Sequence, residues 1–566
     1  MIHPASTDTL VGALSSVHTG LERAKLELTL DGVDAVRIQR DAIIAQIDDY
    51  LLPRVERLDA PLLVVIGGST GAGKSTVTNT LVGAEVSTPG VLRPTTRSPV
   101  LVCHPDDLGW FEGDRILPGL SRTTGLNPGS TSSLRIETAT TLAPGVALLD
   151  TPDIDSVEEA NRNLATQLLS AADLWLFLTT AARYADAVPW DFLRQASDRS
   201  IALAVVLNRV PHEAIDEVGE HLRSMLDNAG LTDALMFAIP EGELASGRLR
   251  PEAIVELHRW LADLITDAEA RAGMVIQTLE GALDSLGPRI TSVTDHLDTQ
   301  AAAVEELRNA VERSYRMATE QVADGLSDGT ILRGEVIDRW QELVGTGDIM
   351  ATIQSRVGWI RDRIKSFFTG REVLAAETQG ALESNIESLL ASEADKAALR
   401  TVDTWRTIAG GWSALGDQAP ALERSSRDFR DLAGRAVREW QGDVLELVRA
   451  QGASKRAAAR AVSLGVNTVG VALMVLVFAQ TSGLTGAEVA VAGGTATVSQ
   501  TLLTAIFGEQ AMRSLAADAR RSLIERVRQI YDDEGGRFIE RLEQLDAGPV
   551  ADELRAAVAE LDGSRD

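Results

Sequence analysis

The stretch LLVVIGGSTGAGKST, at residues 62–76, decides the fold of this chain. Its apolar start predicts a β-strand, its glycines a tight turn, and the residues VTNTLVG that follow a helix. Gly68, Gly73, Lys74 and Ser75 match the P-loop pattern, in which backbone N–H groups surround a phosphate. In such a loop the lysine bridges the β- and γ-phosphates, and the serine hydroxyl coordinates Mg²⁺. The stretch therefore predicts a phosphate-binding turn in an α/β domain.

Short apolar runs recur around this turn and alternate with amphipathic helical segments. Such alternation predicts a largely parallel sheet with helical crossovers. The runs lie at residues 62–67, 98–104, 134–138, 146–150, 173–180, 201–208 and 234–240.

The chain of 566 residues is too long for one core and suits two or three domains. We expect an α/β P-loop domain with a mostly parallel sheet, followed by a long all-α stalk or bundle with a membrane hairpin. The expected parts are N-terminal helices packing on the bundle at 1–60, the P-loop domain at 61–245, the stalk at 246–455, an apolar hairpin at 456–508, and C-terminal helices returning to the bundle at 509–566. Apolar residues between 279 and 311 form one helical stripe. We interpret the stripe as bundle core and not as an extended coiled coil, because Pro288 interrupts it.

Composition excludes some functions. A net charge of −28 argues against nucleic acid as a partner, because phosphate neutralisation needs a basic surface. The single cysteine, Cys103, cannot form an intrachain disulfide, which fits a cytosolic location. The N-terminal residues lack a basic start and a long apolar core, so we expect no signal peptide.

Two further elements fit the P-loop. GVALLDTPD, at residues 145–153, is an apolar strand ending in Asp150, where P-loop domains place a carboxylate that holds Mg²⁺. VLRPTTRSPVLV, at residues 91–102, is a proline-flanked loop before a strand. A threonine in such a loop can meet Mg²⁺ and the attacking water when the γ-phosphate is present, and we favour Thr96 over Thr95.

Taken in order, these motifs resemble those of the dynamin-like and Era-like GTPases. Thr96-Arg97-Ser98-Pro99 is similar to the Thr-Arg-x-Pro of dynamin switch loops. The flanking helices, the helical region and the late apolar hairpin resemble a bacterial dynamin-like protein. The resemblance implies GTP as substrate with Mg²⁺, a homodimer or higher homo-oligomer formed through the nucleotide-binding domains, and work on a lipid membrane.

The sequence departs from the family pattern at three places. Gly71 stands where dynamins usually have serine, and Asp153 replaces the glycine of Asp-x-x-Gly. The guanine-reading Asn-Lys-x-Asp becomes Asn208-Arg209-Val210-Pro211, and proline cannot accept the guanine hydrogens. ATP therefore remains an alternative to GTP, although a nearby carboxylate could substitute. The candidates for that carboxylate are Glu213, Asp216 and Glu241.

We assign residues to three roles. The expected nucleotide-binding residues are Gly68, Ser69, Thr70, Gly71, Ala72, Gly73, Lys74, Ser75, Thr76, Asp153, Asn208 and Arg209. The expected catalytic residues are Lys74 and Thr96, and the expected Mg²⁺ ligands are Ser75, Thr96 and Asp150. Glutamine and histidine do not follow Asp150 closely, so intrinsic hydrolysis should be slow and stimulated by dimerisation.

An apolar segment at about 461–508 carries only one charged residue, Glu488. Its length suits a helical hairpin in a membrane, with a turn at 481–486. Arginine and lysine flank both ends but not the turn, which places both ends at the cytoplasmic face of the cell membrane. The alternative is a buried hairpin in a soluble core. A basic amphipathic stretch at 359–371 either lies on anionic lipid or docks its aromatics on the bundle.

The leading hypothesis is a membrane-associated dynamin-like GTPase that drives tethering, fusion or remodelling. The second is a nucleotide-dependent membrane scaffold with little hydrolysis. An ATP-driven transporter subunit is a weaker third, because a Leu-Ser-Gly-Gly-Gln signature is missing.

Overall fold

The computed structural model describes residues 4–87, 98–113, 115–123, 133–154, 159–198, 201–327, 330–332, 334–344, 372–451, 466–479, 499–500, 503–504 and 506–565. The chain divides into two compact units. The first unit comprises residues 1–26, 32–298 and 547–566, and the second comprises residues 27–31 and 299–546.

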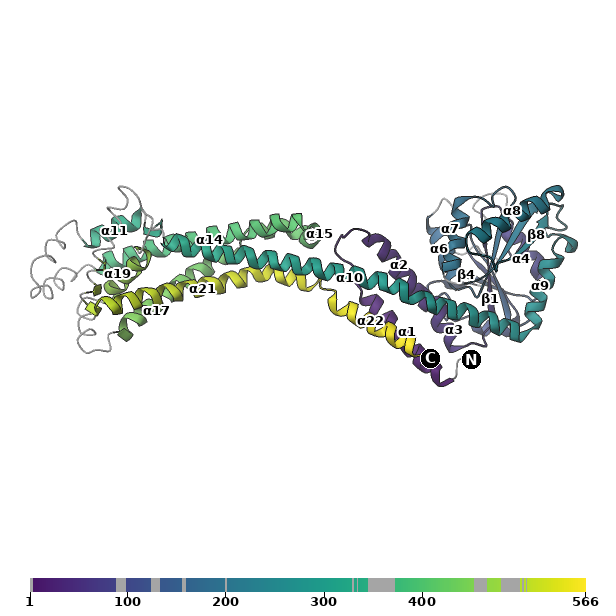
Figure 1. Cartoon of the computed structure of the whole chain (residues 1–566), viewed down its shortest axis with the longest axis horizontal. Helices are drawn as coiled ribbons and strands as arrows, with labels where there is room; N and C mark the ends of the chain where they lie inside the picture. Colours follow the sequence, from purple (N-terminus) through teal and green to yellow (C-terminus); the bar gives the residue numbers. More distant parts are fainter. Residues whose placement is uncertain are drawn as a thin grey trace, which may run out of the picture. The chain divides into compact units, whose positions relative to one another are not determined.

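A sheet forms the centre of the first unit (Figure 1). It has eight strands in the order β3-β4-β2-β5-β1-β6-β7-β8. The strands are β1 (Leu62–Gly68), β2 (Val100–Cys103), β3 (Ser121–Thr123), β4 (Ser133–Thr138), β5 (Val146–Asp150), β6 (Leu174–Thr180), β7 (Ala202–Val210) and β8 (Leu235–Pro240). Every neighbouring pair is parallel except β2 with β5. The predicted mostly parallel α/β sheet is confirmed, and each of the seven apolar runs overlaps one strand. The short strand β3 was not predicted, because three partly exposed residues leave no apolar run.

Helices cover both faces of the sheet. Side chains alternate along β1, so that Leu63 and Val65 face one apolar cluster while Leu62, Val64 and Ile66 face another. The first cluster is covered by α5 (Leu108–Phe111), α6 (Glu159–Ser170), α7 (Ala187–Asp198) and α8 (Ile215–Asn228). The second is covered by α4 (Lys74–Val82), α9 (Val255–Thr266) and the start of α10 (Ala268–Ser327). Short helices η2 (Pro105–Asp107), η3 (His212–Ala214) and η4 (Pro251–Ala253) join strands to helices.

A helical layer with its own core completes the first unit. It consists of α1 (Pro4–Arg23), α2 (Val33–Gln46), η1 (Ile47–Leu51), α3 (Leu52–Glu56), the first part of α10 and α22 (Gly548–Gly563). The buried carboxylate of Asp173, just before β6, accepts hydrogen bonds from the Leu63 N–H and from the buried guanidinium of Arg54 in α3. Thr278 in α10 donates to the Asp173 carbonyl oxygen at 3.0 Å. Because α1 and α22 belong to this layer, both the N-terminal and the C-terminal helix lie in the same unit as the sheet. The compact units thus divide the chain at other points than the expected parts.

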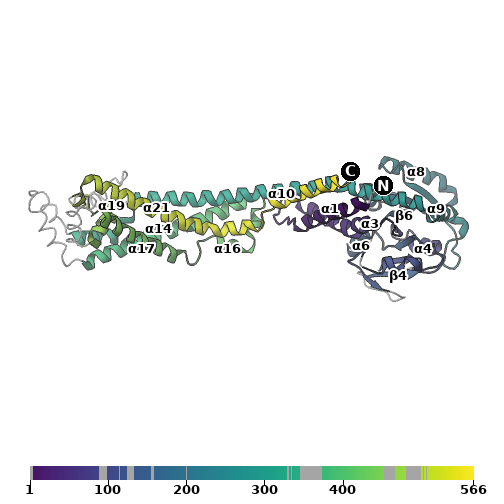
Figure 2. The same cartoon turned by 90° about the horizontal axis from the view of Figure 1, so that it is seen from below.

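The second unit is a helical bundle with one continuous apolar core. Besides the later part of α10 it contains η5 (Thr330–Leu332), α11 (Glu335–Val344), α14 (Glu372–Thr407), α15 (Gly411–Leu415), η6 (Gly416–Gln418), α16 (Ala419–Leu422), α17 (Phe429–Gln451), α19 (Val466–Ala479) and α21 (Glu509–Glu543). Figures 1 and 2 show α14, α17 and α21 running side by side. The predicted long helical region is confirmed.

Pro288 does not interrupt the helical stripe, so that part of the prediction was wrong. It lies inside α10, which continues for 60 residues. A proline costs a helix interior about 3 kcal/mol. Leu286 and Ile290, on either side of it, are fully buried, and their burial helps to offset that cost. The stripe is buried core, as interpreted, but only Val304, Leu307 and Val311 lie in the core of the bundle, whereas its apolar residues from Leu279 to Leu297 lie in the core of the helical layer of the first unit.

The apolar segment expected to enter a membrane is described at 466–479, 499–500, 503–504 and 506–508. Within it, side chains 469–478 of α19 are at most 3% exposed and belong to the bundle core. Phe478 lies against Trp440 of α17, with ring centroids 5.6 Å apart. Among the described helices, none combines the length and apolarity that a bilayer crossing requires. The expected turn at 481–486 and the basic stretch at 359–371 lie outside the described residues.

Candidate nucleotide-binding site

The turn between β1 and α4 is shaped by a close approach of two strands. Gly68 has φ of 148°, and a Cβ there would lie 2.0 Å from the carbonyl oxygen of Leu178 in β6. Only glycine fits such a position. The next residue, Ser69, donates its N–H to the same oxygen at 3.2 Å. The turn is thus fixed to β6 before α4 begins, and the N-terminal end of α4 offers N–H groups to an anion.

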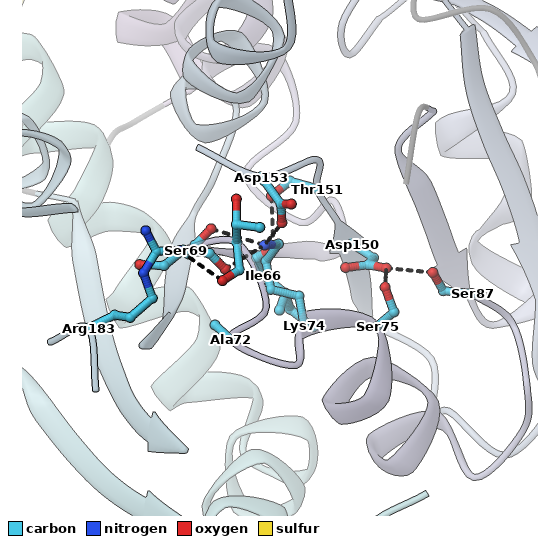
Figure 3. Close-up of polar contacts among 12 residues, drawn as sticks. Ile66, Ser69, Ala72, Lys74, Ser75, Ser87, Asp150, Thr151, Asp153 and Arg183 are labelled. Atoms are coloured by element: carbon cyan, nitrogen blue, oxygen red, sulfur yellow. Dashed lines mark hydrogen bonds and ion pairs between the residues drawn. The ribbon is translucent and has the colours of Figure 1, made fainter. Parts of the chain in front are cut away.

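Lys74 is the first residue of α4 and is 6% exposed. Its ammonium donates to the carbonyl oxygens of Gly68 at 3.0 Å and Ser69 at 3.2 Å. The third donor reaches Oδ1 of Asp153 at 2.5 Å (Figure 3). All three donors of the ammonium therefore have partners, and one partner is a carboxylate.

Asp150, at the end of β5, is fully buried beside the turn. Its Oδ2 accepts hydrogen bonds from the hydroxyls of Ser75 at 2.7 Å and Ser87 at 2.5 Å. Burial raises the pKa of Asp150 above its ordinary value, while the two hydroxyls and the charge of Lys74 oppose the rise. Among the residues that the structure describes, Oδ1 has no hydrogen-bond partner. A cation ligated by the Ser75 hydroxyl would give this oxygen a partner, directly or through water.

Ser87 is a site residue that the sequence did not reveal. The amide of Asn79, in α4, accepts from the N–H groups of Val86 and Ser87 and donates to the Ser87 carbonyl oxygen at 2.6 Å. These bonds hold Ser87 against Asp150. The sequence offered one signal for this contact, which is the polar residue Asn79 at a buried position of α4.

Asp153 is held in place by its neighbours. The N–H and hydroxyl of Thr151 both donate to the carbonyl oxygen of Ile66, at 3.3 and 3.0 Å. The N–H of Ile154 donates to the Gly68 carbonyl oxygen at 3.5 Å. The backbone around Asp153 is therefore tied to the end of β1, beside Lys74.

Asn208, in β7, reaches the turn from the other side. Its Nδ2 donates to the Ala72 carbonyl oxygen at 2.8 Å, and a Cβ on Gly73 would lie 2.7 Å from the same nitrogen. The strand continues to Val210, and Arg209 adopts a left-handed conformation with φ of 56° and an exposed side chain. The structure thus places Asn208 as a brace for the turn.

A second unexpected contact comes from Arg183, which follows β6. Its Nη1 donates to the carbonyl oxygen of Thr70 at 3.0 Å, and its Nε to Asp186 at 3.0 Å. Nothing in the local sequence marks this arginine, because the contact joins residues far apart in the chain.

The remaining predicted residues are placed as follows. Thr70, Gly71 and Thr76 lie in the turn and the first turn of α4, and Thr95 and Thr96 lie outside the described residues. The hydroxyl of Ser69 is buried and has no hydrogen-bond partner among the described residues. The candidate base-reading carboxylates, Glu213, Asp216 and Glu241, are all exposed.

In the described part of the chain, no cluster of three or more histidine, cysteine or acidic residues could hold a metal ion. Magnesium at phosphate sites commonly keeps several waters and uses one or two protein ligands. The Ser75 hydroxyl and the orphaned oxygen of Asp150 fit such a partial ligand set.

The fold and the site together define a class of protein. It is an α/β domain in which a glycine turn, a buried lysine and an aspartate at the end of a strand meet at the carboxyl edge of a mostly parallel sheet. Anionic ligands bind at this edge in such domains. No protein-family profile matches the chain.

A comparison with curated proteins finds "Probable transmembrane GTPase FZO-like, chloroplastic" from Arabidopsis thaliana, 27% identical over 198 residues. The match covers 34% of this chain and 20% of the relative, so this chain spans a fifth of the relative's length.

Solved structures of two chains from an oligomerised bacterial dynamin pair align with TM-scores of 0.42 and 0.36, at 11% and 10% identity. Both alignments cover 94% of this chain, and they cover 95% and 96% of those chains. That pair is described as a mechanism for long-range sensing and tethering of membranes. LeoA, a bacterial dynamin GTPase from ETEC, aligns over 99% of this chain and 100% of its own, at 11% identity and a TM-score of 0.24. The comparisons thus find similarity to dynamin-like GTPases, the resemblance that the motifs predicted.

Proposed function

We propose that this chain is a dynamin-like GTPase that binds and hydrolyses GTP with Mg²⁺. Nucleotide-driven pairing of two such domains would drive tethering, fusion or remodelling of a membrane. The observation that carries the proposal is the convergence of Lys74, Ser75 and Asp150 on one glycine turn. The 27% identity to an FZO-like GTPase over 198 residues supports it.

The residues of the turn would bind and orient the phosphates. Backbone N–H groups of residues 69–75 would hold the β-phosphate, and the Lys74 ammonium would reach the β- and γ-phosphate oxygens. The orphaned Ser69 hydroxyl offers a further donor. Mg²⁺, when bound, would neutralise phosphate charge. Ser75 and Asp150 would hold it, while Thr96 would position the attacking water.

Base recognition would fall to the residues around Asn208-Arg209-Val210-Pro211. Asn208 bonds the turn at 2.8 Å, and Pro211 has no N–H to donate and no side-chain acceptor. The exposed Arg209 could stack on a purine. GTP is favoured by the resemblance, and ATP is the alternative.

The membrane and oligomer parts of the proposal rest on the relatives and on the apolar segment. A solved neighbour is described as tethering membranes as an oligomerised pair. The segment at 461–508 would be the anchor, at the cytoplasmic face of the cell membrane, with a lipid membrane and further copies of the chain as partners. Nucleic acid is not among the partners that we propose, because the chain is strongly acidic.

A specific observation favours the scaffold alternative, in which the chain binds nucleotide but hydrolyses it little. The carboxylate of Asp153 pairs with Lys74, the residue that would stabilise charge on the γ-phosphate.

The test is a calorimetric titration of the full chain with non-hydrolysable GTP and ATP analogues, with Lys74→Ala as control. Turnover is then measured over a range of protein concentrations, with and without anionic vesicles. A GTPase gives Lys74-dependent binding and turnover per molecule that rises with protein concentration. Tight binding with no turnover at any concentration selects the scaffold, and Lys74-independent binding refutes the site.

A further inference from the structure

The ammonium of Lys74 already has an anionic partner inside the chain. Two of its donors bond backbone oxygens of the turn, and the third bonds Oδ1 of Asp153 at 2.5 Å. The Lys74 side chain is 6% exposed and that of Asp153 is 19% exposed, so water screens this ion pair weakly. A γ-phosphate oxygen that bonds this ammonium has to replace one of these three partners, and the carboxylate is the partner carried by a side chain that can rotate away.

The backbone that carries this carboxylate is tied in place. Thr151 before it and Ile154 after it are both hydrogen-bonded to the end of β1. The short tether leaves rotation of the Asp153 side chain as the simplest way to free Lys74. Even when rotated, a carboxylate so close to a bound γ-phosphate adds like-charge repulsion.

We propose that Asp153 is a built-in mimic of the terminal phosphate, which lowers the affinity of this chain for nucleoside triphosphate relative to diphosphate. This inference rests on the proposed function of the site. A β-phosphate would bond Lys74 and also the backbone N–H groups of the turn, and those N–H groups stay available when Asp153 occupies Lys74. The terminal phosphate depends more on Lys74, so the competition falls mainly on the triphosphate. Asp153 is thereby a specificity-determining residue for the number of phosphates.

A purely structural role is the competing explanation. Asp153 could serve only to neutralise a buried ammonium, because unpaired buried charge is costly. That role predicts that losing the carboxylate affects stability and leaves the ratio of triphosphate to diphosphate affinity unchanged.

The test compares Asp153→Asn with the wild-type chain by titrating non-hydrolysable GTP and ATP analogues and the two diphosphates, with Mg²⁺. Asparagine keeps the size of the side chain and removes its charge. Asp191→Asn is the matched control, because Asp191 is exposed and pairs with Arg194. Thermal unfolding without nucleotide shows whether each variant is folded. Asp153→Gly is the second variant, since glycine is the usual residue of the Asp-x-x-Gly motif.

We expect Asp153→Asn to bind the triphosphate analogues about tenfold more tightly than the wild-type chain does, because the Asp153 carboxylate no longer competes for the Lys74 ammonium. Diphosphate binding should change by less than about threefold, and Asp191→Asn should match the wild type. An unchanged affinity ratio in both Asp153 variants would overturn the inference alone. Failure of all nucleotides to bind the wild-type chain and both variants would overturn the proposed function together with it.

Discussion

The buried position of α19 makes a quantitative prediction about the apolar segment. Leu473 lies in the middle of α19 with 0% exposure, inside the bundle core. Leu473→Ala removes a buried isobutyl group and leaves a cavity, which costs about 2–5 kcal/mol in protein cores. If α19 packs in this core in the absence of lipid, the bundle should lose that much free energy of unfolding.

The assay is hydrogen exchange of the full chain in lipid-free and detergent-free buffer. Amides of α17, α19 and α21 should exchange about thirtyfold faster or more, because 1.4 kcal/mol corresponds to a factor of ten. Leu399→Ala is the matched control, since it makes the same chemical change on α14 at a side chain that is 46% exposed. The control should stay within about 0.5 kcal/mol of the wild type.

An equal, small effect of both substitutions would refute this reasoning. It would mean that α19 does not pack in the bundle core in solution, and it would favour lipid as its resting environment. A large effect of Leu473→Ala alone would mean that any membrane insertion of α19 first requires it to leave the core.

Three further predictions concern the first unit. Asp173→Ala should lower the free energy of unfolding of this unit by about 3–5 kcal/mol, because it leaves Arg54 buried without its carboxylate. The double variant Arg54→Met/Asp173→Leu should lose less than the single variants Arg54→Met and Asp173→Leu combined. Additive losses in urea unfolding would contradict this. Burial raises the pKa of Asp49 to about 7, so the folded state binds the extra proton and stability should fall as pH rises from about 4 to about 7. Asp49→Asn should flatten that slope in urea midpoints measured across the range, and an unchanged slope would argue against it. Asn208→Ala removes the bond to the Ala72 carbonyl oxygen, so GTP- and ATP-analogue affinities should fall together by about five- to tenfold; a changed ratio in calorimetry would instead assign Asn208 to base recognition.

Local sequence predicted those features of the fold that depend on neighbouring residues. Buried parallel strands require continuous apolar runs, so each of the seven runs was recognisable. Strand β3 lacks such a run and pairs with β4 through its backbone. Pro288 shows the opposite failure, because tertiary burial overrode a local helix breaker.

The site was predictable where one motif carries it and not where distant residues meet. The glycine turn with Lys74 is contiguous, and Asp150 follows an apolar strand. Ser87 and Arg183 reach the site through contacts between segments far apart in the chain, which one sequence cannot reveal. The sequence marked Asp153 as a departure from glycine, but only the folded structure shows that its carboxylate bonds Lys74.

Cys103, in the core strand β2, has a practical consequence. It is the only cysteine of the chain and is fully buried, and burial raises the pKa of its thiol to about 12. Thiolate is the species that reacts with maleimides, so this thiol should be inert in the folded protein. The wild-type chain is therefore already a suitable background for site-specific labelling. One engineered surface cysteine in each unit would accept a fluorophore pair, and distances between the units could be followed as nucleotide is added.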